Sequence, residues 1–260
     1  MANGIDVYSQ YQKVSNWNSV RSAGTDFVYI KLSDGTATRN EAGYTAGAKA
    51  AGLKVGGYHY AEPGDPVAQA NLFINLCEQH GATDLAPALD LEAPFTPNQA
   101  AINFAIAFLR QVKARGHQPC LYGNNAMLSA VRAPVLAAVP GTLIWAARYG
   151  ANPTVGYDFW QWSDAGKVPG ISASSVDLNK GNIPFNLQEL LTMELTDKVN
   201  YKNRNGGTTT ITVHDVLARV SLMFDDLQWG AAGQRTDGPI AHMQRAQMTA
   251  QGIAIPESVK

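Results

Sequence analysis

The alternation of short apolar runs with helical stretches constrains the fold of this chain more than any other feature. Eight runs are short and rich in β-branched or aromatic residues, which is typical of β-strands. These runs are Ile5–Tyr8, Phe27–Leu32, Val55–Tyr60, Ala86–Glu92, Cys120–Gly123, Leu143–Ala147, Phe159–Trp162 and Ser175–Leu178. Helical segments lie between the first six runs, most clearly at Glu41–Ala51, Pro66–His80 and Pro97–Arg115. The alternation predicts parallel strands joined by right-handed crossovers.

The predicted strands from Leu143 onward are too closely spaced for full helices between them. We therefore expect an α/β fold: a (β/α)5β3 TIM-like barrel over residues 1–181, closed or nearly closed. Beyond residue 181 the alternation of strands and helices ends. We expect a linker at 182–192 and a small C-terminal α+β module at 193–260.

The C-terminal module is predicted from a turn signal and one helical face. Met193–Tyr201 and Thr208–Val213 flank an Asn- and Gly-rich turn and are typical of a β-hairpin. One or two helices follow in the prediction, at Val213–Leu227 and at Ile240–Gln251. So short a module buries little surface alone, so we expect it to dock on the barrel or to form a homo-oligomer through Val213–Leu227.

Four acidic residues fall in or at the ends of predicted strands. Asp6 lies in the first strand, Asp90 and Glu92 end the fourth, and Asp177 lies in the last. Active sites of such barrels lie at the carboxyl ends of the strands, and a closed barrel makes its first and last strands neighbours. Asp6 and Asp177 are therefore expected to be close together. A single Asp at a strand end is more often a helix cap or turn residue, but four converging acids favour a site.

The spacing of Asp90 and Glu92 places both carboxylates on one face of a strand. Mutual repulsion and partial burial raise the pKa of at least one, as a general acid requires near neutral pH. Glycoside hydrolysis is the chemistry that this arrangement favours, since it needs a proton donor and an anionic group beside an oxocarbenium-like centre.

Polar and aromatic side chains near the strand ends complete the candidate site. The candidates for substrate binding are Lys31, Tyr58, Tyr60, Tyr122, Trp145, Trp160 and Gln161. Each of these aromatic side chains, taken alone, fits a place in the core as well as it fits a surface on which a sugar ring packs. Lys31 is either a surface lysine or a counter-charge to the acids, and His59, which alternates away from Tyr58 and Tyr60, is expected to be structural.

Charge and cysteine content exclude several other functions. Lys and Arg number 20 and Asp and Glu 21, so no basic field exists to hold a nucleic acid. No apolar run is long enough for a membrane helix, and no metal-binding cluster or phosphate loop is present. We expect no cofactor and no metal. The two cysteines, Cys77 and Cys120, are expected to be buried free thiols.

Several motifs, in order, resemble the family 25 glycoside hydrolases, the lysozyme-type muramidases of bacteriophages, bacteria and some fungi. The motifs are Gly4-Ile5-Asp6-Val7-Tyr8-Ser9-Gln10, Phe27-Val28-Tyr29-Ile30-Lys31, Ala51-Gly52-Leu53-Lys54-Val55-Gly56-Gly57-Tyr58-His59-Tyr60, Ala88-Leu89-Asp90-Leu91-Glu92, Trp160-Gln161-Trp162-Ser163 and Ser175-Val176-Asp177-Leu178-Asn179. The resemblance covers roughly residues 3–181. Arg39-Asn40 departs from it, because an acid is common before the second helix of the family.

The resemblance implies cleavage of the β-1,4 bond between N-acetylmuramic acid and N-acetylglucosamine in peptidoglycan, without a metal. It makes Glu92 the general acid and Asp90 its carboxylate partner, as electrostatic stabiliser or as the group that orients the substrate acetamido group. Asp6 and Asp177 complete an acidic floor. Tyr58, Tyr60, Tyr122, Trp160 and Gln161 fall where the family lines its sugar groove. A glycosyl-enzyme and an acetamido-derived intermediate both stay open.

The N-terminus, Met1 to Asp6, shows no basic stretch followed by an apolar run, so no signal peptide is expected. A muramidase without a signal peptide and with a small C-terminal module resembles a bacteriophage endolysin, which is made in the host cytoplasm and reaches the wall after holin-type release. The module would then bind the cell wall or self-associate. Two alternatives remain. A virion or tail component would bind peptidoglycan without cleaving it, and a chitinase-like barrel would carry a longer acidic run before Glu92.

Overall fold

The structure is a computed structural model that describes residues 1–39, 41–181, 198–202 and 208–212. The chain divides into two compact units, Met1–Ile183 and Pro184–Lys260, and each is described by itself. The predicted turn at 203–207 and the predicted helices Val213–Leu227 and Ile240–Gln251 lie outside the described residues.

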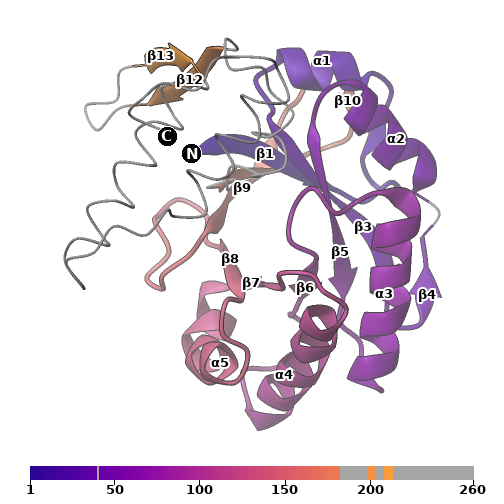
Figure 1. Ribbon diagram of the computed structural model, residues 1–260, viewed down its shortest axis with the longest axis vertical. Helices are drawn as coiled ribbons and strands as arrows, with labels where there is room; N and C mark the ends of the chain where they lie inside the picture. The colour runs from indigo at the N-terminus through magenta and orange to yellow at the C-terminus, as the bar shows by residue number, and fades with distance from the viewer. Residues whose placement is uncertain (40, 182–197, 203–207, 213–260) are drawn as a thin grey trace, which may run out of the picture. The chain divides into compact units, whose positions relative to one another are not determined.

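The first unit is a closed, mixed eight-stranded barrel of the α/β class (Figure 1). The barrel strands are β1 (Ala2–Val7), β3 (Phe27–Asp34), β5 (Lys54–Tyr60), β6 (Ala88–Asp90), β7 (Cys120–Asn124), β8 (Leu143–Ala147), β9 (Phe159–Gly166) and β11 (Val176–Gly181). Pairing of β1 with β3 closes the ring, and the short β4 (Ala37–Thr38) extends from β3. Each of the eight predicted strands therefore overlaps a barrel strand, although the ends of most differ by one or more residues.

Two features of the strands differ from expectation. The last strand, β11, runs antiparallel to both of its neighbours, β1 and β9. A parallel pair needs a crossover of a dozen or more residues, and the connection from Gly166 to Val176 is too short and instead holds β10 (Ile171–Ser172). The fourth strand ends at Asp90, so Glu92 lies in the loop after β6 and not within the strand.

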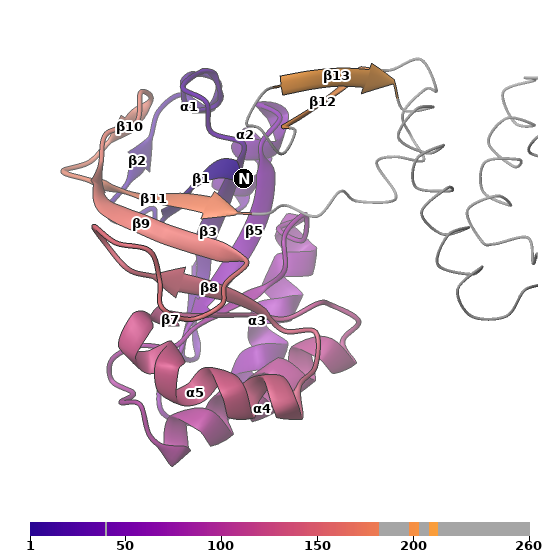
Figure 2. The same ribbon diagram turned by 90° about the vertical axis from the view of Figure 1, so that its left-hand side faces the viewer.

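A helix follows each of the first five barrel strands, and within residues 1–181 the chain between β8, β9 and β11 contains none (Figures 1 and 2). The helices are α1 (Trp17–Ser22), α2 (Ala42–Ala50), α3 (Pro66–His80), α4 (Gln99–Ala114) and α5 (Asn125–Ala138). Helix α3 matches its predicted bounds because Asp65 caps its start and Gly81 ends it in the left-handed conformation, with φ of 69°. Helix α4 begins after Pro97 because Asn98 accepts the capping bond from the backbone N–H of Ala101.

Two apolar clusters support the barrel. One lies between the helices and the outer side of the strands, and it contains Cys77. The other fills the barrel interior with aromatic rings, among which Tyr29 stacks on Trp145 at a centroid distance of 4.5 Å and Phe159 packs edge-on. Cys120 belongs to this inner cluster, so both cysteines are buried free thiols, as predicted. The inner rings leave room for polar side chains only at one mouth of the barrel.

Smaller elements complete the described structure. In the first unit β2 (Lys13–Val14) pairs with β10. In the second, β12 (Lys198–Lys202) and β13 (Thr208–Thr212) pair antiparallel, with Lys198 opposite Thr212, where the hairpin is predicted. Over the described ranges, the helices are all too short or too polar to cross a membrane.

Candidate active site

A cavity of about 240 Å³ opens at the mouth where the parallel strands end. It brings together every predicted site residue except Trp160. The lining residues are Asp6, Tyr8, Tyr11, Gln12, Lys31, Tyr58, Tyr60, Asp90, Glu92, Tyr122, Trp145, Gln161 and Asp177. Asp6 and Asp177, which are 171 positions apart in the chain, share this pocket because β1 pairs with β11.

Trp160 is a correction to the predicted site. Side chains alternate along a strand, so Trp160 and Gln161 of β9 point to opposite faces, and it is Gln161 that lines the pocket. The indole N–H of Trp160 donates to the carbonyl oxygen of Arg148 at 2.8 Å, and the ammonium of Lys180 lies 5.9 Å from the ring. The alternation excludes Trp160 from any site that uses Gln161.

Asp6 and Asp177 form the floor of the pocket, opposite each other in the register of β1 and β11. Oδ1 of the buried Asp6 accepts hydrogen bonds from Nδ2 of Asn179 at 2.6 Å and from Nε2 of Gln161 at 3.0 Å. Burial raises the pKa of Asp6 in spite of these bonds. Burial, followed by the nearby charge of Asp6, raises the pKa of Asp177 to about 8. The pair therefore keeps a proton to a higher pH than two free aspartates would.

The shared proton predicts how stability depends on pH. The pKa of Asp177 rises from 3.8 to about 8 on folding, so between these values the folded protein holds a proton that the unfolded chain has released. This contribution to stability is complete below about pH 4 and is lost as the pH rises through 8. We expect urea unfolding to show a free energy of unfolding that falls from pH 5 to pH 8, and Asp177→Asn to flatten that fall. An equally steep fall in the variant would contradict the shared proton.

Asp90 and Glu92 stand where the chain leaves β6. The loop is held by the backbone bond from Leu91 N to the carbonyl of Tyr122, at 3.0 Å, and by the hydroxyl of Tyr60, which donates to the carbonyl of Ala93. Leu89 and Leu91 are fully buried in the outer cluster, so the intervening acids face the pocket, as predicted.

The two acids differ in exposure. Asp90 is buried, and its Oδ1 has no hydrogen-bond partner within the described structure. Burial, and then the charge of Glu92, raises the pKa of Asp90 well above its usual value. Burial also raises the pKa of the half-buried Glu92, while the ammonium of Lys31 opposes the rise. The two carboxyl groups thus titrate together, and Glu92 is the one that a ligand in the cavity reaches.

Gln161 is the hub of the polar network beneath the cavity. Its Oε1 accepts from the hydroxyl of Tyr122 and from that of Tyr149, both at 2.9 Å, and its Nε2 donates to Asp6. Asn179 joins the same network through its bond from the indole N–H of Trp145, at 2.8 Å. Sequence reasoning missed Tyr149 and Asn179. Asn179 could have been found, because it shares a face of the last strand with Asp177.

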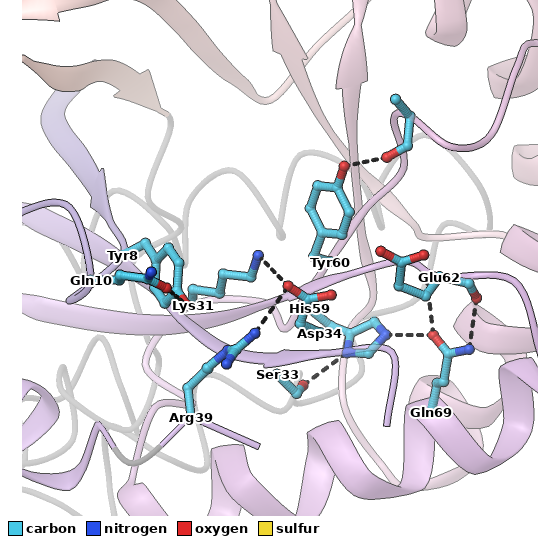
Figure 3. Close-up of polar contacts among 11 residues, drawn as sticks. Tyr8, Gln10, Lys31, Ser33, Asp34, Arg39, His59, Tyr60, Glu62 and Gln69 are labelled. Carbon is cyan, nitrogen blue, oxygen red and sulfur yellow. Dashed lines mark hydrogen bonds and ion pairs between the residues drawn. The ribbon is translucent and has the colours of Figure 1, made fainter. Parts of the chain in front are cut away.

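Lys31 is a pocket residue and not a surface lysine. Its side chain is 10% exposed, and Nζ lies 2.8 Å from Oδ2 of Asp34. Asp34 also pairs with Arg39, at 3.3 Å, so the residue that departs from the family pattern has a defined partner (Figure 3). Sequence reasoning missed Asp34. Its signal was a position three residues after Lys31, at the carboxyl end of the same strand.

His59 is structural, as predicted. It is fully buried, Nδ1 lies 2.8 Å from the hydroxyl of Ser33, and Nε2 lies 2.9 Å from Oε1 of Gln69 (Figure 3). Burial lowers its pKa to about 4, so the ring is neutral at physiological pH. The network joins β3, β5 and α3 below the pocket.

The loop after β1 supplies a part of the rim that the sequence did not reveal. Tyr8, Tyr11 and Gln12 line the cavity, and the rings of Tyr8 and Tyr11 meet edge to face at 5.2 Å. Tyr11 is 67% exposed. In residues 1–39, 41–181, 198–202 and 208–212, His, Cys, Asp and Glu side chains form no group of three or more suited to hold a metal ion.

The similarity to known proteins lies in the barrel residues. Residues 5–171 match the family model described as glycosyl hydrolases family 25. An autolytic lysozyme of Clostridium acetobutylicum is 32% identical over 179 residues, 66% of this chain and 53% of that protein. An N,O-diacetylmuramidase of a Chalaropsis species is 32% identical over 62% of this chain and 88% of that protein. The chain thus spans about half the length of the clostridial relative.

Solved structures agree on the fold. A bacterial lysozyme from Streptomyces coelicolor is 28% identical, with a TM-score of 0.59 over 70% of this chain and 92% of that chain. The catalytic domain of an endolysin from a Listeria monocytogenes bacteriophage is 27% identical, with a TM-score of 0.58 over 70% of this chain and 93% of that chain.

Proposed function

Since the chain belongs to the glycosyl hydrolases of family 25, we propose that it is a lysozyme-type muramidase that cleaves the β-1,4 bond between N-acetylmuramic acid and N-acetylglucosamine. The observation that carries this proposal is the Asp90–Glu92 pair, whose pKa values are both raised in a pocket lined with aromatic rings. The named relatives support it, since they are lysozymes and a muramidase.

In the proposed reaction Glu92 donates a proton to the glycosidic oxygen as the bond breaks. Its half-buried position gives it access to the substrate, and burial raises its pKa, which favours the protonated form that a general acid needs. The buried Asp90, once ionised, stabilises the oxocarbenium-like centre or orients the acetamido group. Asp6, fixed by Asn179 and Gln161, holds its oxygen toward the same space. The rings of Tyr58, Tyr122 and Trp145 exclude water from the pocket floor.

Digestion of bacterial walls with product analysis tests the proposal. The whole chain is expected to reduce the turbidity of a wall suspension and to release new reducing ends at N-acetylmuramic acid. Reducing ends at N-acetylglucosamine would contradict muramidase activity and would instead indicate another glycosidase. Binding to walls without new reducing ends would favour the alternative, a non-catalytic peptidoglycan-binding barrel of a virion or tail component.

The biological setting is a further part of the proposal. The chain would act as a bacteriophage endolysin that is made in the host cytoplasm and reaches the wall after holin-type release; the likeness to a phage endolysin domain supports this. Expression in a bacterial host with and without a holin tests it, and lysis only with the holin is expected. Peptidoglycan is then the partner, with no nucleic acid or membrane bound.

Self-association through Val213–Leu227 stays a prediction, and it has its own measurement. Light scattering after size exclusion is expected to give a mass above 27.9 kDa for the whole chain and a monomer for residues 1–182. If the whole chain and residues 1–182 are both monomeric, self-association is contradicted, and wall binding is left as the role of the C-terminal residues.

A further inference from the structure

We propose that Asp34 is a positioning residue of this pocket: it anchors the ammonium of Lys31 at the pocket edge, and the balance of the two charges sets the pH range in which Asp90 and Glu92 work. The inference rests on the proposed hydrolysis, because a pH–rate profile reads it out. It assigns a role to an ion pair that the reaction described above does not use.

Among the residues that the structure describes, Asp34 is the anion that pairs with the ammonium of Lys31. The side chain is 10% exposed, so water hydrates it poorly, and Oδ2 of Asp34 lies 2.8 Å away. Aromatic rings confine it from two other directions, since Nζ lies 4.3 Å from the ring centroid of Tyr60 and 4.9 Å from that of Tyr8 (Figure 3). The ammonium is therefore held in place and cannot swing freely into the cavity.

Asp34 is held in turn from its other side. The Nη2 atom of Arg39 lies 3.3 Å from the same Oδ2, and its guanidinium lies 5.5 Å from the ring of Tyr8. Partial burial favours the neutral acid, but Lys31 and Arg39 outweigh it and lower the pKa of Asp34. Asp34 therefore ionises more readily than a free aspartate, whereas the pKa values of Asp90 and Glu92 are raised.

Lys31 connects this ion pair to the reacting groups. Its charge lowers the pKa of Asp90 and of Glu92, whereas the charge of Asp34 raises that of Asp90. The charged and titratable groups around Lys31 are Asp34 and Arg39 beside it, Tyr8 after β1, Tyr60 and the buried His59 of β5, and the pocket residues Asp6, Tyr58, Asp90, Glu92 and Asp177.

Removing Lys31 and removing Asp34 must therefore shift the pH–rate profile in opposite directions. Removal of the cation by Lys31→Met disfavours the ionised forms of Asp90 and Glu92, so both limbs of a bell-shaped profile move to higher pH. Removal of the anion by Asp34→Asn leaves Lys31 uncompensated and removes a charge that repels Asp90. Both limbs then move to lower pH.

The test is the pH dependence of kcat/KM for wall digestion by the whole chain. We expect shifts of about half a pH unit or more, upward for Lys31→Met and downward for Asp34→Asn. Asp34→Glu keeps the anion and is expected to stay close to the unmodified chain. Glu78→Gln is the matched control, because Glu78 also pairs with basic side chains, those of Arg115 and His117, but lies outside the pocket.

Thermal unfolding of each variant separates a pH effect from misfolding. Should Asp34→Asn fail to fold, Arg39→Gln takes its place and is expected to give a smaller upward shift, because it leaves the charge of Asp34 less neutralised. An active chain whose profile moves in the same direction for Lys31→Met and Asp34→Asn, or moves no more than in Glu78→Gln, would overturn this inference alone. A chain that releases no reducing ends at any pH would overturn the proposed function as well.

Discussion

Glu92→Gln is expected to lower kcat for wall digestion about a thousandfold, since a positioned general acid contributes between about a hundredfold and ten-thousandfold. The amide keeps the shape of the side chain but has no proton that it can transfer. Glu92 is half-buried, and its side chain makes no hydrogen bond or ion pair within the described residues. The thermal midpoint is therefore expected to change little. The measurement is the rate of new reducing ends from a wall suspension, together with the far-UV circular dichroism of the variant.

The control for this substitution is Glu62→Gln. Glu62 follows β5 near the pocket but does not line it, and only its backbone takes part in the bonds to Gln69 (Figure 3). Its replacement is expected to leave the rate within about twofold. Full activity in Glu92→Gln would remove the general acid assigned to this site. Equal losses in the two variants would show an effect of surface charge and not of proton transfer.

Phe108→Ala is expected to destabilise the barrel by about 3–5 kcal/mol, the cost of truncating a large buried ring. Phe108 of α4 is fully buried and stacks on His59 at a centroid distance of 5.0 Å. It also meets Phe73 at 6.0 Å and Phe104 at 6.3 Å. The ring therefore joins two helices to the strand that carries Tyr58 and Tyr60, and its loss leaves a cavity that these rigid elements close poorly.

Urea unfolding of the whole chain measures this cost, with Phe108→Leu as the matched control. Leucine keeps most of the apolar volume, so we expect a loss of about 1 kcal/mol. The folded Phe108→Ala variant should still digest walls at low temperature, because the side chain lies outside the pocket. A loss below about 1 kcal/mol for alanine would contradict the packing described between α3, α4 and β5.

The local pattern of the sequence was enough to find the barrel strands. Each predicted run overlaps one, because a strand buried in a barrel is a short apolar run along the chain. Helix α3 was predicted to the residue, since its cap and its terminal glycine are local signals. The direction of β11 was not predicted, because it depends on the length of a connection and not on any residue within the strand.

The candidate site was predictable to a similar degree. Ten of its predicted residues line one cavity because strand-end polar residues in a closed barrel have nowhere else to converge. Tyr8, Tyr11 and Gln12 were missed because they lie on a loop, where no periodicity indicates the direction of a side chain. The proposed roles of the acids, and the self-association of the C-terminal residues, stay predictions.

The sequence by itself determined the order of the barrel strands and of the helices between them, because spacing along the chain carries this order. It also indicated the family, through the resemblance of its motifs. Only the tertiary structure decided which face of β9 points inward, so that Gln161 and not Trp160 enters the pocket. It alone paired Asp34 with both Lys31 and Arg39, and raised the pKa of Asp177 to about 8 through burial beside Asp6. The physical reason is that burial and charge pairing depend on distances between residues far apart in the chain, which a linear pattern does not contain.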